Sequence, residues 1–417
     1  MREFQPYINH LKRLTVKPDE YAAVADALDG QAAVKLRELV PTSQRRAAGA
    51  YFTSRKLAAD LWALAVKTTT GPVVLLDPAC GAGDLLMPAL PWLLKHANRR
   101  KVAPESLVLG MDIAPEFVEA TRLRLTLAFH SLGLRSSASE FSGVSTKDAL
   151  SDIDTIQRAT HILVNPPYTH EVLTNDWTSG RTNRAAHFID HILNSCRPDT
   201  WIWAILPDVL RSGARYARWR RSVVRRARVD HISVMGPFDS HTDVDVFILG
   251  LEARRRVYSG RSADNWSKSR ATTTVGEAFR ISVGPVVNYR HSHTGPKVPY
   301  LVASDATPFA EEEVTGRTRR FAGRLQQPPF VAIRRTSSPS DEQRGIGTLI
   351  VGDRPVAVDN HLMIAAPRSG SIDDCRALVA ALSQRRTTVA LNRSIRCRHL
   401  TVGSVTELAL PQRPNRP

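Results

Sequence analysis

The sequence contains few cysteines, few lysines and no long apolar run. Its 417 residues include only four cysteines, far apart at positions 80, 196, 375 and 397. Neither a disulfide framework nor a pair with metal-ligand spacing is therefore indicated. The longest apolar runs, such as 73–76 and 201–206, are far shorter than the roughly 18–20 residues of a membrane-spanning helix. Because the first residues also lack the apolar core of a signal peptide, we expect a cytoplasmic protein with no membrane partner.

The charge of the chain is strongly unbalanced. Lysine and arginine number 57 against 40 acidic residues, which gives a formal net charge of +17. Ten of these cations are lysine, so the excess is almost wholly arginine. A protein this basic is expected to bind a polyanion, although a genome biased toward arginine could also supply it to a solvated surface.

Three regions differ in their hydrophobic pattern. Residues 1–48 carry apolar residues at helical spacing, and we interpret them as an N-terminal helical extension. Between about 49 and 255, short apolar strands alternate with amphipathic helices, which predicts a largely parallel α/β sheet buried on both faces. Its last two strands are too closely connected for a crossover helix and should be antiparallel. After a polar segment, residues 276–417 predict a second, β-rich domain with one clear helix near 373–382.

Two segments of the α/β region are basic or polar. A single arginine-rich helix is predicted over about 212–228, and some of its arginines are expected to contact phosphates. Residues 169–187 are predicted to form a long polar loop.

A glycine-rich turn follows the first predicted strand. The segment Asp77-Pro-Ala-Cys-Gly81-Ala-Gly83 joins an acid at the strand end to two glycines, which let the backbone approach a ligand closely. Asp112 ends the next strand, where a carboxylate can accept hydrogen bonds from ribose hydroxyls. The pattern predicts a nucleotide-like cofactor, although tight-turn glycines and a capping acid could share this spacing.

The tetrapeptide Asn165-Pro-Pro-Tyr168 directly follows the strand 161–164. Its two prolines stiffen the turn at the edge where open α/β sheets bind ligands. An aromatic amine is a poor nucleophile because its lone pair is delocalised. The Asn165 side chain and the Pro166 carbonyl can each accept one N–H and so favour a tetrahedral nitrogen. Tyr168 can stack on the ring.

With these motifs in this order, the chain resembles the S-adenosylmethionine-dependent amino-methyltransferases. It is most similar to the DNA adenine-N6 methyltransferases of restriction–modification systems, with the resemblance strongest over about 45–255. The resemblance implies a Rossmann-like, mostly parallel seven-stranded sheet with an antiparallel strand near its end. It also implies a C-terminal α+β target-recognition domain. No metal is expected, because the sulfonium already activates the methyl group.

The resemblance also implies roles for individual residues. The catalytic residues would be Asn165, Pro166, Pro167 and Tyr168. The cofactor-binding residues would be Thr53, Asp77, Ala79, Gly81, Gly83, Asp112, Ile113 and Asp148. Tyr168 and Phe238 would pack against an extruded base, although Phe238 suits a core position equally well. The candidate DNA-binding residues are Arg181, Arg184, Arg334 and Arg335.

These inferences favour a monomeric enzyme that methylates adenine N6 at a specific site in duplex DNA. Methylation would protect the site from a separate cognate restriction endonuclease. One alternative keeps the chemistry but changes the substrate to cytosine N4, RNA guanine N2 or a protein glutamine amide. The other alternative is a DNA-binding module that has lost catalysis.

Overall fold

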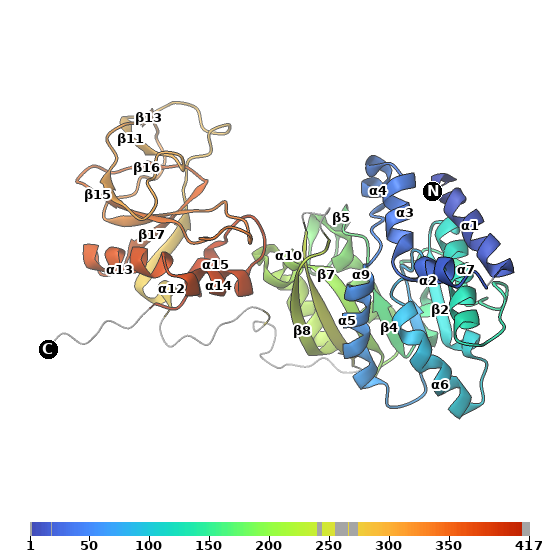
Figure 1. The fold of residues 1–417 in the computed structure, drawn as a ribbon. Coiled ribbons are helices and arrows are strands. Elements are labelled where there is room, and N and C mark those ends of the chain that lie inside the picture. Colours follow the sequence, from blue (N-terminus) through green and yellow to red (C-terminus); the bar gives the residue numbers. More distant parts are fainter. Residues whose placement is uncertain (1, 18, 240–243, 255–265, 267–273, 411–417) are drawn as a thin grey trace. The chain divides into compact units, whose positions relative to one another are not determined.

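The computed structural model describes residues 2–17, 19–239, 244–254, 266 and 274–410 (Figure 1). They divide into two compact units, the first formed by residues 1–210 and 218–263 and the second by 211–217 and 264–417. The helices of residues 2–48 belong to the first unit. None of the helices in these ranges is long and apolar enough to cross a membrane.

A seven-stranded sheet forms the centre of the first unit. Its strand order is β3-β2-β1-β4-β7-β9-β8. Every neighbouring pair from β3 to β7 is parallel, whereas β9 is antiparallel to both β7 and β8. The strands are β1 (Leu75–Asp77), β2 (Val108–Asp112), β3 (Val144–Thr146), β4 (His161–Val164), β7 (Trp201–Pro207), β8 (Ala227–Pro237) and β9 (Asp245–Ala253). This arrangement confirms the predicted α/β sheet and its antiparallel final pair.

Helices pack against this sheet because each buries an apolar stripe. Leu61 of α5, Leu93 of α6 and Leu125 of α7 share one apolar core with strand residues such as Leu75 and Ile205. The helices of this unit are α1 (Gln5–Val16), α2 (Tyr21–Leu28), α3 (Gln31–Leu39), α4 (Thr42–Ala48), α5 (Arg55–Ala65), α6 (Leu90–Arg100), α7 (Pro115–Ser131), α8 (Ile153–Arg158), α9 (Arg184–Ser195), α10 (Asp208–Ser212) and α11 (Ala217–Arg226). The last two residues of α10 fall in the chain range assigned to the second unit.

The N-terminal helices cover the outer side of α7 (Figure 1). The ring of Phe117 on α7 makes edge contacts with Phe4 at 5.4 Å and with Phe52 at 5.0 Å between centroids. Because Phe52 belongs to the segment that follows α4, this aromatic cluster holds that segment against the sheet domain.

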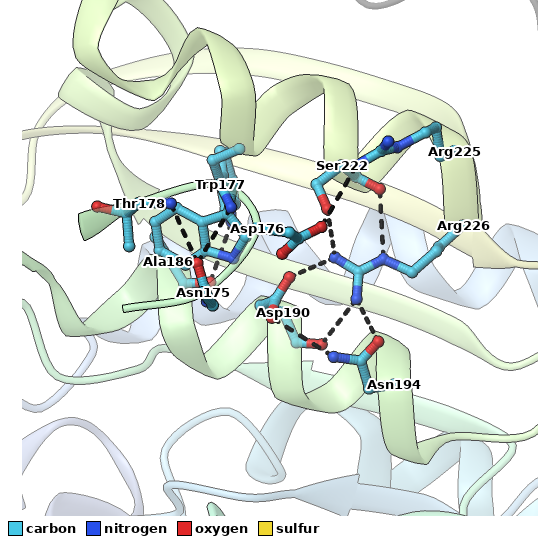
Figure 2. Close-up of polar contacts among 11 residues, drawn as sticks. Asn175, Asp176, Trp177, Thr178, Ala186, Asp190, Asn194, Ser222, Arg225 and Arg226 are labelled. Carbon is cyan, nitrogen blue, oxygen red and sulfur yellow. Dashed lines mark hydrogen bonds and ion pairs between the residues drawn. The ribbon is translucent and has the colours of Figure 1, made fainter. Parts of the chain in front are cut away.

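Two predicted segments differ in the structure. Residues 169–187 do not form a long loop: β5 (His170–Thr174) and β6 (Ser179–Asn183) form an antiparallel hairpin, and α9 follows directly. The Asn175 side chain accepts hydrogen bonds from the Trp177 and Thr178 amides at 3.1 Å, which closes the turn without glycine or proline (Figure 2). Trp177 is buried, so the tip of the hairpin packs against the rest of the protein.

The predicted arginine-rich helix is also broken into shorter elements. Helix α10, a 3-10 turn at Ala214–Tyr216 and α11 replace it, and β8 begins at Ala227. Several arginines of this stretch bind protein groups or are buried. Arg226 pairs with Asp190 and with Asn194 (Figure 2), Arg228 pairs with Glu252 at 2.8 Å, and Arg211 is only 2% exposed.

The second unit contains a five-stranded and a three-stranded sheet. Their orders are β10-β17-β14-β15-β12 and β13-β11-β16. The strands are β10 (Phe279–Val283), β11 (Lys297–Leu301), β12 (Glu311–Glu313), β13 (Thr318–Arg320), β14 (Phe330–Arg334), β15 (Gly347–Val351), β16 (Ala357–Val358) and β17 (Leu362–Pro367). Besides the predicted helix, α13 (Ile372–Leu382), the unit has α12 (Val275–Ala278), α14 (Arg385–Ser394) and α15 (Val402–Thr406). The β-rich α+β prediction is thus confirmed, but three of its helices were missed.

A buried ion pair links the N-terminal helices to the glycine-rich turn. Arg124 of α7 is fully buried, pairs with Asp84 at 2.8 Å and donates a hydrogen bond to the Ala27 carbonyl at 2.9 Å. Removing one member of a buried pair leaves the other charge uncompensated.

We expect Asp84→Ala to lower the free energy of unfolding by about 3–5 kcal/mol. The control Asp60→Ala removes the exposed Lys56–Asp60 pair and should cost less than about 1 kcal/mol. Urea unfolding of both variants measures the difference. Equal losses would contradict a structural role for the buried pair.

Candidate active site

The carboxyl ends of three neighbouring strands meet at one edge of the sheet. Asp77 ends β1, Asp112 ends β2 and Asn165 directly follows β4, and these three strands are adjacent and parallel. A cavity of about 390 Å³ opens at this edge. Its lining includes Ala79, Gly81, Asp112, Ile113, Asp148, Asn165 and Pro167. The structure therefore brings most of the predicted cofactor residues, and Asn165 and Pro167 of the predicted catalytic tetrapeptide, to one site.

Neighbouring side chains pack against the glycine-rich turn and fix its conformation. Gly81 and Gly83 have positive φ angles of 50° and 85°. A Cβ atom on Gly81 would lie 2.7 Å from the Phe52 ring, so only glycine fits there. The Thr121 hydroxyl donates to the Gly81 carbonyl at 2.7 Å and fixes the turn to α7.

The Asp112 carboxylate organises the same turn. One oxygen accepts from the Gly81 amide at 3.0 Å, and the other accepts from the Ala114 amide at 2.9 Å. A carboxylate has about four acceptor positions, so hydroxyl groups of a ligand can still be bound. Burial raises the pKa of Asp112, while these amide hydrogen bonds lower it. The neighbouring Ile113 is 62% exposed and offers an apolar surface to a ligand ring.

Asp77 is enclosed beneath the turn. Its side chain is 1% exposed and accepts one hydrogen bond from the Ala79 amide at 3.0 Å. The pKa of Asp77 is raised to about 8, mainly by burial; the hydrogen bond from the Ala79 amide lowers it, and the nearby carboxylates of Asp112 and Asp84 contribute to the increase. A buried acid of this kind is ready to lose its proton when a cationic group binds beside it.

The amide of Asn165 has one satisfied and one unsatisfied end. Its Nδ2 donates to the hydroxyl oxygen of Thr53 at 3.0 Å. Its Oδ1 is buried and has no hydrogen-bond partner within the described parts of the chain. Leaving a buried polar atom unpaired costs free energy, so such an atom is a candidate for binding a ligand. Here the unpaired atom is an acceptor, the type that an amino group requires.

The rings of Tyr168 and Phe238 lie in edge-to-face contact. Their centroids are 6.1 Å apart with an interplanar angle of 78°. The Tyr168 hydroxyl donates to the Ile205 carbonyl at 3.2 Å, which fixes the direction of the ring. Phe238 is only 5% exposed and belongs to the apolar core of the sheet domain. Its contact with a base stays a prediction.

The four predicted DNA-binding arginines are divided equally between the two units. Arg181 is exposed on hairpin strand β6, whereas Arg184 begins α9 and lines the cavity beside Asp148. In the second unit, Arg334 donates to the Ala306 carbonyl at 2.9 Å and Arg335 to the Asn360 carbonyl at 2.7 Å. Their contact with DNA remains a prediction.

Two neighbours of the site, Phe52 and Gly49, were given no role of their own by the sequence analysis. Phe52 packs on Gly81, as described above. Gly49 has a φ of 64°, and a Cβ atom there would lie 2.6 Å from the Pro167 Cβ. The glycine at position 49 was the only signal for this close approach, and it could not be interpreted without knowing which residue lay opposite.

The raised pKa of Asp77 predicts a pH dependence of stability. A folded-state pKa above the unfolded value means that the folded protein holds the proton more tightly. The stabilisation from the neutral acid is therefore complete below about pH 4 and is lost as the pH rises toward 8. Asp77→Asn keeps a neutral side chain at every pH. We expect its free energy of unfolding, relative to the unsubstituted protein, to increase between pH 4 and 8 and then to level off. Urea unfolding without cofactor would show this, and a pH-independent difference would contradict it.

Comparison with known proteins agrees with this geometry. The sequence model of the family described as N-6 DNA Methylase matches residues 36–256, more than half of the chain. Among curated proteins, no match is found. Among solved structures, the type IIL restriction-modification enzyme MmeI, determined in complex with DNA, is similar with a TM-score of 0.53. It is 12% identical, over 91% of this chain and 70% of that protein.

Two further solved structures are similar at lower scores. The type IIG restriction endonuclease BpuSI has a TM-score of 0.48 and 14% identity, over 91% of this chain and 61% of that one. The M protein of the type I restriction enzyme EcoKI has a TM-score of 0.40 and 14% identity, over 59% of this chain and 66% of that one. The chain thus spans 61–70% of the length of these three proteins.

Proposed function

The chain belongs to the N-6 DNA methylase family of S-adenosylmethionine-dependent methyltransferases, and from this premise we propose which reaction its site performs. Membership confirms the family, the enzyme class and the cofactor predicted from the sequence. We propose that the enzyme transfers a methyl group from S-adenosylmethionine to N6 of an adenine that is flipped out of duplex DNA.

The unpartnered Oδ1 of Asn165 is the observation that carries this proposal. An amine entering the site can donate one N–H to this oxygen, and the Pro166 carbonyl is the natural acceptor for the second. Two acceptors on one side favour a tetrahedral nitrogen whose lone pair points away from them. They also stabilise the positive charge that develops on nitrogen during transfer.

The residues around the cavity fit the cofactor. Asp112 can bind the ribose hydroxyls, and Ile113 and Asp148 can contact the adenine. Beneath the turn formed by Ala79, Gly81 and Gly83, Asp77 would lose its proton and pair with the ammonium group. S-adenosylmethionine itself supplies the activated methyl group, so the protein's task is to position the amine and exclude water.

DNA binding completes the proposal. A base inside a duplex cannot reach this cavity, so the adenine must be extruded at a cost of a few kcal/mol. Stacking of the base on Tyr168, supported by Phe238, can offset about 1–3 kcal/mol of this cost. Arg181 and Arg184, together with Arg334 and Arg335, are the proposed contacts to the nucleic acid. We further propose that methylation protects the site from a separate cognate endonuclease.

Asn165→Ala tests the proposed reaction. It should abolish methyl transfer to duplex DNA and leave the dissociation constant of S-adenosylmethionine within about threefold, because Asn165 binds the amine rather than the cofactor. Modified-base sequencing of DNA from an expressing host identifies the methylated atom and the site. Parallel assays with RNA and a release-factor protein serve as controls. A retained rate in Asn165→Ala, or methylation of RNA or protein alone, would refute the proposal.

Arg181→Ala tests the proposed phosphate contact on the hairpin. Losing one phosphate contact should reduce the slope of log Kd against log salt by about 0.9. The control is Arg100→Ala. Arg100 is exposed and is the last residue of α6, which precedes the amino end of β2, whereas the cavity lies at the carboxyl ends of the strands. The control should leave the slope unchanged. Equal slopes for Arg181→Ala and the unsubstituted protein would exclude this contact.

A further inference from the structure

The segment that follows α4 contacts the catalytic tetrapeptide at two points. Gly49 approaches Pro167 so closely that no side chain would fit between them. Four residues later, the Thr53 hydroxyl accepts the hydrogen bond from Asn165 Nδ2. Between these two points, Phe52 packs on Gly81 and on Phe117. Residues 49–53 therefore bridge the glycine-rich turn and the tetrapeptide.

Thr53 has a hydrogen to donate and no partner for it in the described chain. Thr53 is 3% exposed, and its hydroxyl accepts from Asn165 and donates to no described residue. It lines a narrow pocket together with Asp77, Gly81 and Asn165, next to the larger cavity. A buried hydroxyl normally satisfies its hydrogen as well as its oxygen. This hydrogen is therefore available to an acceptor on a bound ligand.

We propose that Thr53 is a positioning residue that fixes the amide orientation of Asn165 once the cofactor is bound. This inference rests on the proposed function. A hydroxyl has a single hydrogen, so Thr53 can face Asn165 either with that hydrogen or with a lone pair. When an acceptor on the cofactor takes the hydrogen, only a lone pair remains toward Asn165. The amide must then turn Nδ2 to Thr53, and Oδ1 is left facing the amine.

The consequence is a coupling between the two substrates. Without the cofactor, the amide can present either end to the incoming base, and an Nδ2–H group facing an amino group is repulsive. With the cofactor, every molecule presents Oδ1. Binding of the cofactor should therefore tighten binding of the flipped adenine, and the reverse must hold by thermodynamic reciprocity.

Thr53→Val and Thr53→Ser form the matched pair of variants. The valine side chain has the shape of threonine but can neither donate nor accept a hydrogen bond, whereas serine keeps the hydroxyl group. We would measure the Kd of a duplex carrying the mapped site with and without S-adenosylhomocysteine, which has no methyl group to transfer. We would also measure the single-turnover rate at saturating S-adenosylmethionine, and the Kd of the cofactor by calorimetry.

In the unsubstituted protein, we expect S-adenosylhomocysteine to tighten duplex binding. Thr53→Val should lose this tightening and transfer methyl groups about 100-fold more slowly even at saturating cofactor. Thr53→Ser should recover both properties. Cofactor binding by Thr53→Val, with whatever affinity, shows that the variant is folded. If that variant does not fold, the same losses are expected in Thr53→Ala.

Three results would overturn the inference. One is a Thr53→Val enzyme that binds the cofactor weakly but reaches the normal rate at saturation, since Thr53 would then serve the cofactor alone. Another is unchanged tightening of duplex binding by S-adenosylhomocysteine in Thr53→Val. The third is a serine variant as impaired as the valine variant. These results differ from a failure of the proposed function itself, which would appear as a normal rate of methyl transfer in Asn165→Ala.

Discussion

An unpaired acceptor at a buried position is the constraint on which the rest of the site depends. A polar atom removed from water without a partner costs on the order of 1–3 kcal/mol, and folded proteins accept this cost mainly where the atom has a task. At Asn165, one end of the amide is held by Thr53 and the other is left for an amino group. Pro166 restricts the backbone of Asn165 to extended conformations and so limits the directions that its side chain can take.

The fold brings the cofactor and the amine to this point through the geometry of parallel strands. The turns after β1, β2 and β4 emerge at the same sheet edge because these strands run side by side in one direction. Asp112 then joins two of these turns by accepting from the Gly81 amide. The N-terminal helices add a second support, since the aromatic cluster around Phe117 presses Phe52 onto the glycine-rich turn. The site is thus assembled from segments more than 100 residues apart.

The basic character of the chain has two components in the structure. Some arginines form ion pairs within the protein: Arg124 pairs with Asp84, and Arg226 pairs with Asp190. Others, such as Arg181 on β6, remain exposed. Net charge therefore indicates a polyanionic partner in general, but it overstates the number of groups available to bind one. Residues 170–183 likewise form an antiparallel hairpin whose tip residue Trp177 is buried, and not the long polar loop that was predicted.

The sequence by itself determined the local parts: buried strands, the glycine-rich turn after β1, the tetrapeptide after β4 and the antiparallel final strands. These follow from periodicity and from backbone restrictions that act over a few residues. Only the tertiary structure decided which distant side chains meet. The Asn165–Thr53 hydrogen bond spans 112 positions, and the fit of Gly49 against Pro167 depends on how the N-terminal helices pack on α7. No local pattern encodes such contacts, because they arise from the packing of whole elements. For the same reason, the pairing of Arg226 and the hairpin closed by Asn175 could not be read from composition or turn residues.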